Sequence, residues 1–128
     1  MEFTINLTTK ELAYATDWAG VKSGCSIDKW NALGLTPEPG IKVACPSIKE
    51  SPLSIECRVK QIIGLGSHHM FIADVLGVYA NEEYINPDTG KFELQQANLI
   101  AYSHGAYYEL GNYIGKFGFS VEKKKSKQ

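Results

Sequence analysis

The chain has little excess charge, few cysteines and no long hydrophobic run, and each absence argues against a class of protein. Its 13 basic and 14 acidic residues nearly balance. Four of the basic residues are lysines within the last six positions, so residues 1–122 hold 9 basic against 14 acidic residues, a net charge of −5. Phosphate neutralisation needs clustered Lys and Arg. We therefore expect no nucleic-acid partner for this acidic body.

Secretory and membrane features are also missing. The first residues, Met1 to Leu7, lack the positive segment and the apolar run of a signal peptide. No stretch approaches the roughly 20 apolar residues that a membrane-spanning helix needs. The three cysteines, Cys25, Cys45 and Cys57, are odd in number and lack a Cys-x-x-Cys spacing, which favours reduced thiols. These observations predict a cytoplasmic protein with no membrane partner.

Common nucleotide-binding and hydrolase motifs do not occur. Gly64 and Gly66 lead into Ser67 and a predicted strand, whereas a dinucleotide or Walker loop would lead into a helix. The chain has no Gly-x-Ser-x-Gly elbow. A hydrolase built on Ser67 or Ser103 is disfavoured, because successive residues of a strand point to opposite faces. By this reasoning the Ser67 and His68 side chains should not bond as nucleophile and base.

A metal centre is disfavoured on similar grounds. Zinc ligands usually occur at tight, recognisable spacings, and two adjacent histidines on one strand diverge. We therefore expect no metal, although four side chains of suitable type are present: His68, His69, His104 and Asp74.

What is present favours one mainly β domain. A chain of 128 residues with 44% hydrophobic side chains can bury one core without disulfides. Seven Tyr, five Phe, two Trp, twelve Gly and five Pro favour strands joined by turns. We predict a single domain over residues 1–122, mainly β with two short helices. A basic tail at residues 123–128 should be disordered.

Local patterns locate the elements. Residues 8–11, Thr-Thr-Lys-Glu, match a capping box that predicts a helix through Ala19, stopped by Gly20. A second helix at residues 27–33 should begin at the N-cap Ser26 and end at Gly34. Weaker patterns predict strands at 3–7, 41–45 and 99–102, and a surface loop over the sheet at 103–111.

Two longer strands follow from the apolar pattern. Residues 53–60 alternate, which predicts a buried face and a wet face that carries Ser54, Glu56, Arg58 and Lys60. A bulge is expected at Ile62-Ile63, where the alternation breaks. Residues 70–79 are largely apolar on both faces, as in a strand that is covered on both sides or lies at a subunit contact.

The turn before that strand carries the best functional candidate. Residues 66–69, Gly-Ser-His-His, place two histidines at a strand entrance. Histidine titrates near physiological pH, so it can donate, accept or carry charge toward a ligand. A histidine in this position is nevertheless more often an ordinary half-buried hydrogen-bonding residue. Four tyrosines could likewise stack on a planar ligand or serve as core and interface residues: Tyr102, Tyr107, Tyr108 and Tyr113.

Several motifs occur together in a familiar order. They are Phe-Thr-Ile-Asn-Leu at 3–7, Ser-Gly-Cys-Ser-Ile-Asp-Lys-Trp at 23–30, Leu-Gly-Leu-Thr-Pro at 33–37, the strand at 53–59, the segment 66–75, and Ile-Gly-Lys-Phe-Gly at 114–118. In this order the chain resembles the flavin reductase-like proteins with the FMN-binding split-barrel fold, especially the flavoredoxin branch.

The resemblance has implications for the fold, for the part of the family's domain that the chain contains, and for its partner. It implies a partial split β-barrel of the Greek-key type that corresponds to the family's C-terminal two-thirds, with the N-terminal strands missing. Open sheet edges would then need a cover. We therefore expect a homodimer.

The resemblance also implies an activity. Family members transfer hydride from NAD(P)H to FMN, and the cofactors carry that chemistry. His68 would be the catalytic residue, and the cofactor-binding residues would be Ser23, Gly24, Lys29, Ser67, His68 and Tyr107. The alternative is a truncated, cofactor-free remnant that acts only as a folded or protein-interaction module.

Overall fold

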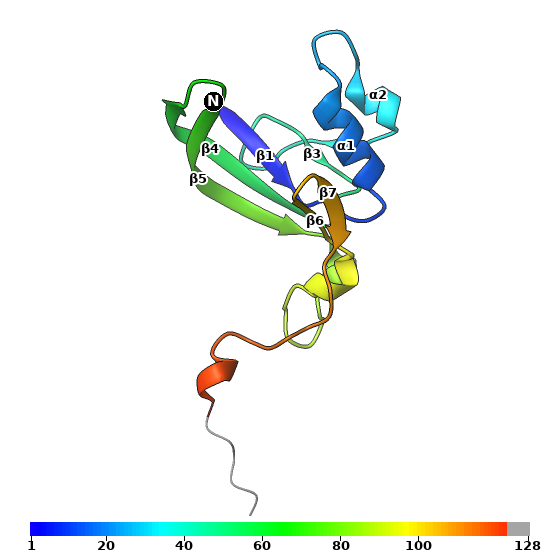
Figure 1. The fold of residues 1–128 in the computed structure, drawn as a ribbon, viewed down its shortest axis with the longest axis vertical. Helices are drawn as coiled ribbons and strands as arrows, with labels where there is room; N and C mark the ends of the chain where they lie inside the picture. The colour runs from blue at the N-terminus through cyan, green and yellow to red at the C-terminus, as the bar shows by residue number, and fades with distance from the viewer. Residues whose placement is uncertain (123–128) are drawn as a thin grey trace, which may run out of the picture.

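The computed structural model describes residues 1–122, and the predicted basic tail at 123–128 lies outside them. The chain is mostly β with two helices, as expected (Figure 1). Its elements are β1 (Glu2–Asn6), α1 (Ala13–Val21), α2 (Lys29–Leu33), β2 (Pro37–Glu38), β3 (Ser47–Ile48), β4 (Leu53–Gly64), β5 (His69–Ala80), β6 (Ile100–Ser103) and β7 (Ala106–Glu109), with short 3-10 helices at Glu82–Tyr84, Leu94–Ala97 and Phe119–Val121.

An antiparallel sheet in the order β1-β4-β5 is the frame of the molecule. Its two long strands form a hairpin whose tip holds residues 65–68. The register shifts between Glu56 and Cys57 and again between Val59 and Gln61. The bulge predicted at Ile62-Ile63 is therefore wrong in position, because those two residues pair regularly with the first residues of β5.

Helix α1 starts later than the capping box predicted. Thr9 is buried and forms an isolated β-bridge with Leu99, so tertiary pairing holds residues 8–12 outside the helix. The Thr9 hydroxyl accepts the N–H of Leu12 at 3.3 Å, but the helix begins only at Ala13. Gly20 does not stop the helix, which continues to Val21.

Helix α2 is also shorter than predicted. Its N-cap is Asp28, not Ser26, because the Asp28 carboxylate accepts the N–H groups of Trp30 and Asn31 at 3.1 and 3.3 Å. Gly34 ends the helix as predicted, with a left-handed φ of +64°.

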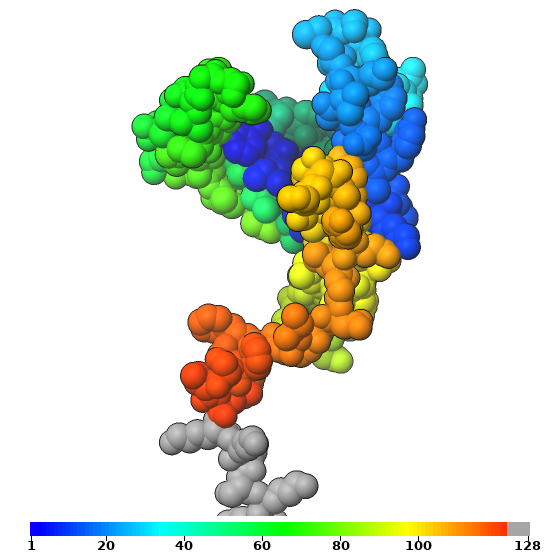
Figure 2. All heavy atoms as spheres, viewed as in Figure 1, coloured from blue at the N-terminus to red at the C-terminus, as the bar shows by residue number. Residues whose placement is uncertain are grey.

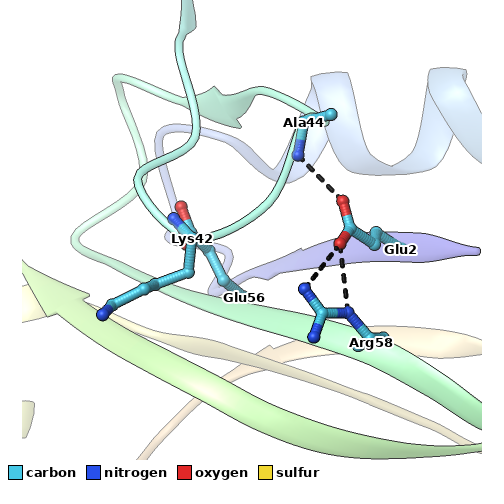
Figure 3. A network of polar contacts seen from close by, with 5 residues as sticks. All are labelled: Glu2, Lys42, Ala44, Glu56 and Arg58. Atoms are coloured by element: carbon cyan, nitrogen blue, oxygen red, sulfur yellow. Dashed lines mark hydrogen bonds and ion pairs between the residues drawn. The ribbon is translucent and has the colours of Figure 1, made fainter.

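The strand expected at 41–45 does not form. Residues 38–48, here called the covering segment, instead cross one face of the sheet and are held there by side chains of the sheet (Figure 3). Glu56 accepts the N–H of Ile41 at 2.7 Å and that of Lys42 at 2.6 Å. Glu2 accepts the N–H of Ala44 at 2.9 Å. These carboxylates replace a strand partner for the segment's backbone.

The covering segment reverses the exposure predicted for β4. Ser54 and Glu56 were expected on a wet face, but both are buried, and Glu56 is only 2% exposed. Only the far part of that face, with Arg58 and Lys60, is open to solvent. Alternation marked which residues share a face, but it carried no information about a loop that covers the face.

The opposite face of the sheet, here called the apolar sheet face, is largely uncovered. Ile5 pairs with Ile55 and Ile55 with Val78, while Phe71 packs edge-on against Phe3 with ring centroids 6.5 Å apart. Strand β5 is thus not covered on both sides within the described chain, and its apolar residues on this face are exposed: Phe71, Val75 and Val78.

The C-terminal part begins with a second hairpin. Residues 103–111 were expected to form a surface loop, but β7 pairs with β6 through a two-residue turn. His104 and Gly105 both have positive φ, 53° and 81°, as a tight hairpin turn requires. After β7 the chain leaves the body and runs away from it (Figure 1).

Candidate functional site

The tip of the β4–β5 hairpin brings Ser67 and His68 together. Gly66, with a φ of +82°, turns the chain, and the N–H of Leu65 donates to the carbonyl of His68 at 2.8 Å. The Ser67 hydroxyl lies 2.8 Å from Nδ1 of His68. The prediction that these side chains do not bond is wrong, because both residues lie in the turn before the strand begins, where strand alternation does not apply.

The segment between the helices brings Ser23, Gly24 and Lys29 together. Lys29 Nζ donates to the carbonyl oxygen of Ala19 at 2.5 Å, so the ammonium group lies at the C-terminal end of α1, where the helix dipole favours a cation. A Cβ on Gly24 would lie 3.6 Å from Cε of Lys29. The Ser23 hydroxyl accepts the N–H of Cys25 at 3.3 Å.

Tyr107 connects the second hairpin to helix α1. Its hydroxyl donates to Asp17 at 3.2 Å, and its ring packs edge-on against Tyr102 with centroids 5.2 Å apart. Partial burial, and then the Asp17 carboxylate, raise the pKa of Tyr107 above its usual value. Sequence reasoning missed Asp17, and no local signal marks it, because it lies ninety positions from its partner.

The predicted residues therefore form two clusters, with Tyr107 tied to the helical one. Figure 2 shows the hairpin tip and the helices on opposite sides of an open hollow, with β1 between them. Four surface cavities of this chain lie elsewhere, among them one of about 440 Å³ beside Glu56 and Tyr79. The candidate residues thus line an open surface and none of these four cavities.

The other histidines and Asp74 do not join either cluster through a bond. Asp74 pairs with Lys60 at 3.1 Å on the open part of the sheet. His104 lies in the β6–β7 turn. Among residues 1–122 no three His, Cys, Asp or Glu side chains gather where they could hold a metal ion.

Two of the solved structures that share this fold are flavoredoxins. Flavoredoxin of Desulfovibrio vulgaris (Miyazaki F) is 28% identical with a TM-score of 0.85, and the match covers 94% of this chain and 65% of that chain. Flavoredoxin from Methanosarcina acetivorans is 25% identical with a TM-score of 0.81, covering 94% of this chain and 66% of that one. These likenesses define the molecule as a flavin reductase split-barrel fold.

Residues 1–111 match the flavin reductase like domain, and the chain belongs to that family. An uncharacterized protein of Archaeoglobus fulgidus is 38% identical over 77 residues, which are 60% of this chain and 44% of the relative. The chain thus spans less than two thirds of the length of these relatives. No helix within residues 1–122 is long and apolar enough to cross a membrane.

Proposed function

We propose that the chain is an FMN-binding oxidoreductase of the flavin reductase type, which transfers hydride from NAD(P)H to the flavin. The observation that carries this proposal is the match of residues 1–111 to the flavin reductase like domain, a range that contains every candidate site residue. We further propose that residues 1–122 make up one domain of this kind.

The donors on the chain fit such a ligand. The imidazole of His68, the hydroxyl of Ser23 and the ammonium of Lys29 suit the polar edge of a flavin and its phosphate. The bond from Lys29 to Ala19 uses one of three ammonium donors, so two remain for a ligand. When bound, the flavin and nicotinamide supply the hydride chemistry, so the protein has to orient them and stabilise charge.

His68 has the central role in this proposal. The Ser67 hydroxyl contacts Nδ1, which leaves Nε2 on the opposite side of the ring for a ligand. From the hairpin tip, Nε2 holds the nicotinamide carboxamide or stabilises the negative charge that develops on the flavin. Tyr107, already bonded to Asp17 of α1, would contact the ligand from the helix side.

Titration of the purified protein with FMN tests binding. Perturbed flavin absorbance and quenched flavin fluorescence are the expected results, and an unchanged spectrum at tens of micromolar FMN would refute the proposal. His68→Ala should slow flavin reduction by the nicotinamide at least about tenfold while changing flavin affinity less. The neighbouring His69→Ala is the matched control, because His69 is also exposed but belongs to β5.

A second candidate, a cofactor-free interaction module, is favoured by one specific observation. Only four hydrophobic residues of the described chain are buried, while the apolar sheet face is exposed. The FMN titration separates this candidate from the first. The same exposed face supports our proposal that the protein is a homodimer, and the three free cysteines support a cytoplasmic location.

A further inference from the structure

The β6–β7 hairpin is fastened to the stretch of chain that leads into α1. The N–H of Ile100 donates to the carbonyl of Thr8 at 3.1 Å. The N–H of Lys10 donates to the carbonyl of Asn98 at 2.9 Å, and the Lys10 ammonium pairs with the Glu109 carboxylate at 3.0 Å. Because these contacts join both strands of the hairpin to the start of the helical part, a side chain of β7 keeps a defined position relative to α1.

Tyr107 of β7 is held from two sides. Its hydroxyl donates to Oδ1 of Asp17 on α1 at 3.2 Å. Its ring packs edge-on against Tyr102 of β6 with centroids 5.2 Å apart, an arrangement that aromatic pairs favour. A tyrosine side chain has only two torsion angles to fix. The helix and the neighbouring strand together therefore set the orientation of the Tyr107 ring and of its hydroxyl.

The bond to Asp17 leaves the Tyr107 hydroxyl with one kind of hydrogen bond to offer a ligand. A phenol has a single proton, and an ionised carboxylate only accepts, so this proton is used in the bond to Asp17. The lone pairs of the phenol oxygen remain for a ligand group that donates an N–H or an O–H. Donation to a carboxylate also polarises the hydroxyl, which makes its oxygen a better acceptor.

The same pair of residues is unsuited to a phosphate. The oxygens of an ionised phosphate accept hydrogen bonds, and the Asp17 carboxylate repels their negative charge. A cation that suits a phosphate lies at the end of the same helix, where Lys29 Nζ donates to the carbonyl of Ala19. Helix α1 thus holds two side chains with opposite preferences, Lys29 for an anion and Tyr107 for an uncharged donor.

We propose that Asp17 is a positioning residue, which orients Tyr107 to accept a hydrogen bond from an uncharged N–H or O–H group of the flavin. FMN carries such donors on the imide of its ring and on the hydroxyls of its ribityl chain, and none of them belongs to the phosphate. The inference rests on the flavin binding proposed above and assigns one part of the ligand to this pair. In it, Asp17 acts on the ligand only through Tyr107.

Affinities for flavins with and without a phosphate test this assignment. Asp17→Ala should raise the dissociation constants of FMN and of riboflavin by the same factor, about 3- to 10-fold, because both flavins carry the donor groups. Asp17→Asn keeps an acceptor oxygen and should have a smaller effect. The matched control is Asp88→Asn, which removes the charge of another exposed aspartate and should change neither constant.

Lumiflavin, which has the ring but no ribityl chain, locates the donor. If Asp17→Ala weakens lumiflavin binding by the same factor, the donor is the ring imide. If the affinity for lumiflavin is unchanged while that for riboflavin falls, the donor is a ribityl hydroxyl. Both results support the inference, because either group is an uncharged donor of the flavin.

A double-mutant cycle shows whether Asp17 acts through Tyr107. In a Tyr107→Phe chain there is no hydroxyl to orient, so adding Asp17→Ala should change neither dissociation constant further. An effect of Asp17 on the fold alone would not depend on that hydroxyl. A further loss of affinity in the Tyr107→Phe chain, a loss for FMN without one for riboflavin, or a loss confined to the nicotinamide would overturn the inference.

The same titrations keep this inference separate from the proposed function. Wild-type protein that binds neither FMN nor riboflavin would refute both. Wild-type protein that binds FMN, with the same affinity in Asp17→Ala, would refute the role of Asp17 alone. Asp17 is exposed, so its substitution removes no buried side chain, and far-UV circular dichroism checks that each variant is folded. The isosteric Asp17→Asn repeats the comparison if the alanine variant is unfolded.

Discussion

Glu56→Ala should strongly destabilise the fold, although Glu56 is one of the most polar residues in the sheet. Glu56 is 2% exposed, and its carboxylate accepts the N–H groups of Ile41 and Lys42 at 2.7 and 2.6 Å. Figure 3 shows Glu56 next to Lys42 of the covering segment. A hydrogen bond to a charged group contributes about 1.5–3 kcal/mol, so the pair contributes about 3–6 kcal/mol. The substitution also leaves two backbone donors without an acceptor. We expect the free energy of unfolding to fall by about 3–5 kcal/mol.

Glu56→Gln gives a graded result, because an amide has the same shape and one acceptor oxygen. It can accept one of the two N–H groups, while its own N–H₂ group faces the other donor. The loss should therefore be smaller than for alanine but still above about 1 kcal/mol. Urea unfolding followed by circular dichroism measures both changes, with equal slopes taken as evidence of an unchanged unfolding transition.

Glu11→Ala is the matched control, because Glu11 is an exposed glutamate, and its removal should cost less than about 0.5 kcal/mol. A loss of less than about 1 kcal/mol for Glu56→Ala would refute the reasoning, since the covering segment would then not depend on the carboxylate. Equal losses for the alanine and glutamine variants would show that the two oxygens do not act as separate acceptors.

Three further predictions concern other contacts of the same frame. Gly40→Ala should lower the free energy of unfolding in urea by about several kcal/mol, because a Cβ there would lie 2.2 Å from the carbonyl oxygen of Val43. A variant as stable as the wild-type protein would show that the covering segment shifts freely. The N–H of Ala44, and then Arg58, lower the pKa of Glu2 below its usual 4.5, so the unfolded chain binds this proton more readily and the stabilisation is lost as pH falls below about 4.5; Glu2→Gln should flatten that part of the stability curve, and an unchanged curve would contradict the assignment. Tyr107→Phe should cost less than about 1 kcal/mol, because it removes a partly exposed hydroxyl bonded to Asp17, and the absorbance change that it removes from the ultraviolet titration of the tyrosines should lie on the high-pH side, because the pKa of Tyr107 is raised; a loss on the low-pH side would contradict the raised pKa.

Much of the frame could be predicted from the sequence, because strands and turns leave local patterns. The two strands of the long hairpin appear as alternating and apolar runs, and Gly34 ends α2 as predicted. The turn at 86–90 has a local pattern as well, Asn-Pro-Asp-Thr-Gly, and there the Asn86 side chain accepts the N–H groups of Asp88 and Thr89 at 2.9 and 3.0 Å. These features depend on residues close together in the chain.

The errors arise where distant residues override a local pattern. Thr9 matches a capping box but pairs with Leu99, and the apparent strand at 41–45 is held by carboxylates of β1 and β4. Residues 103–111 were predicted to form a loop because they are rich in Gly and Tyr. In the structure, His104 and Gly105 instead form the short turn of the β6–β7 hairpin. The first two corrections depend on partners far away in the sequence, whereas β6 and β7 are neighbours whose short turn the composition did not reveal.

The candidate site was only partly accessible to the same reasoning. The two clusters around His68 and Lys29 are each compact in sequence, so their internal contacts follow from local geometry. The pairing of Tyr107 with Asp17 joins residues from opposite ends of the chain and has no local signature. The assigned roles of these residues in flavin chemistry stay predictions.

The covering segment is held through its main chain, and this affects which of its residues can be substituted during evolution. Glu56 and Glu2 bind main-chain N–H groups of residues 41, 42 and 44, and every residue except proline offers such a group. The identities of those three side chains are therefore free to drift without loosening the segment. Gly40 has no such freedom, because its neighbours leave no room for a side chain. For these hydrogen bonds, sequence constraint falls on the two acceptors and one glycine, while the three residues they hold are interchangeable.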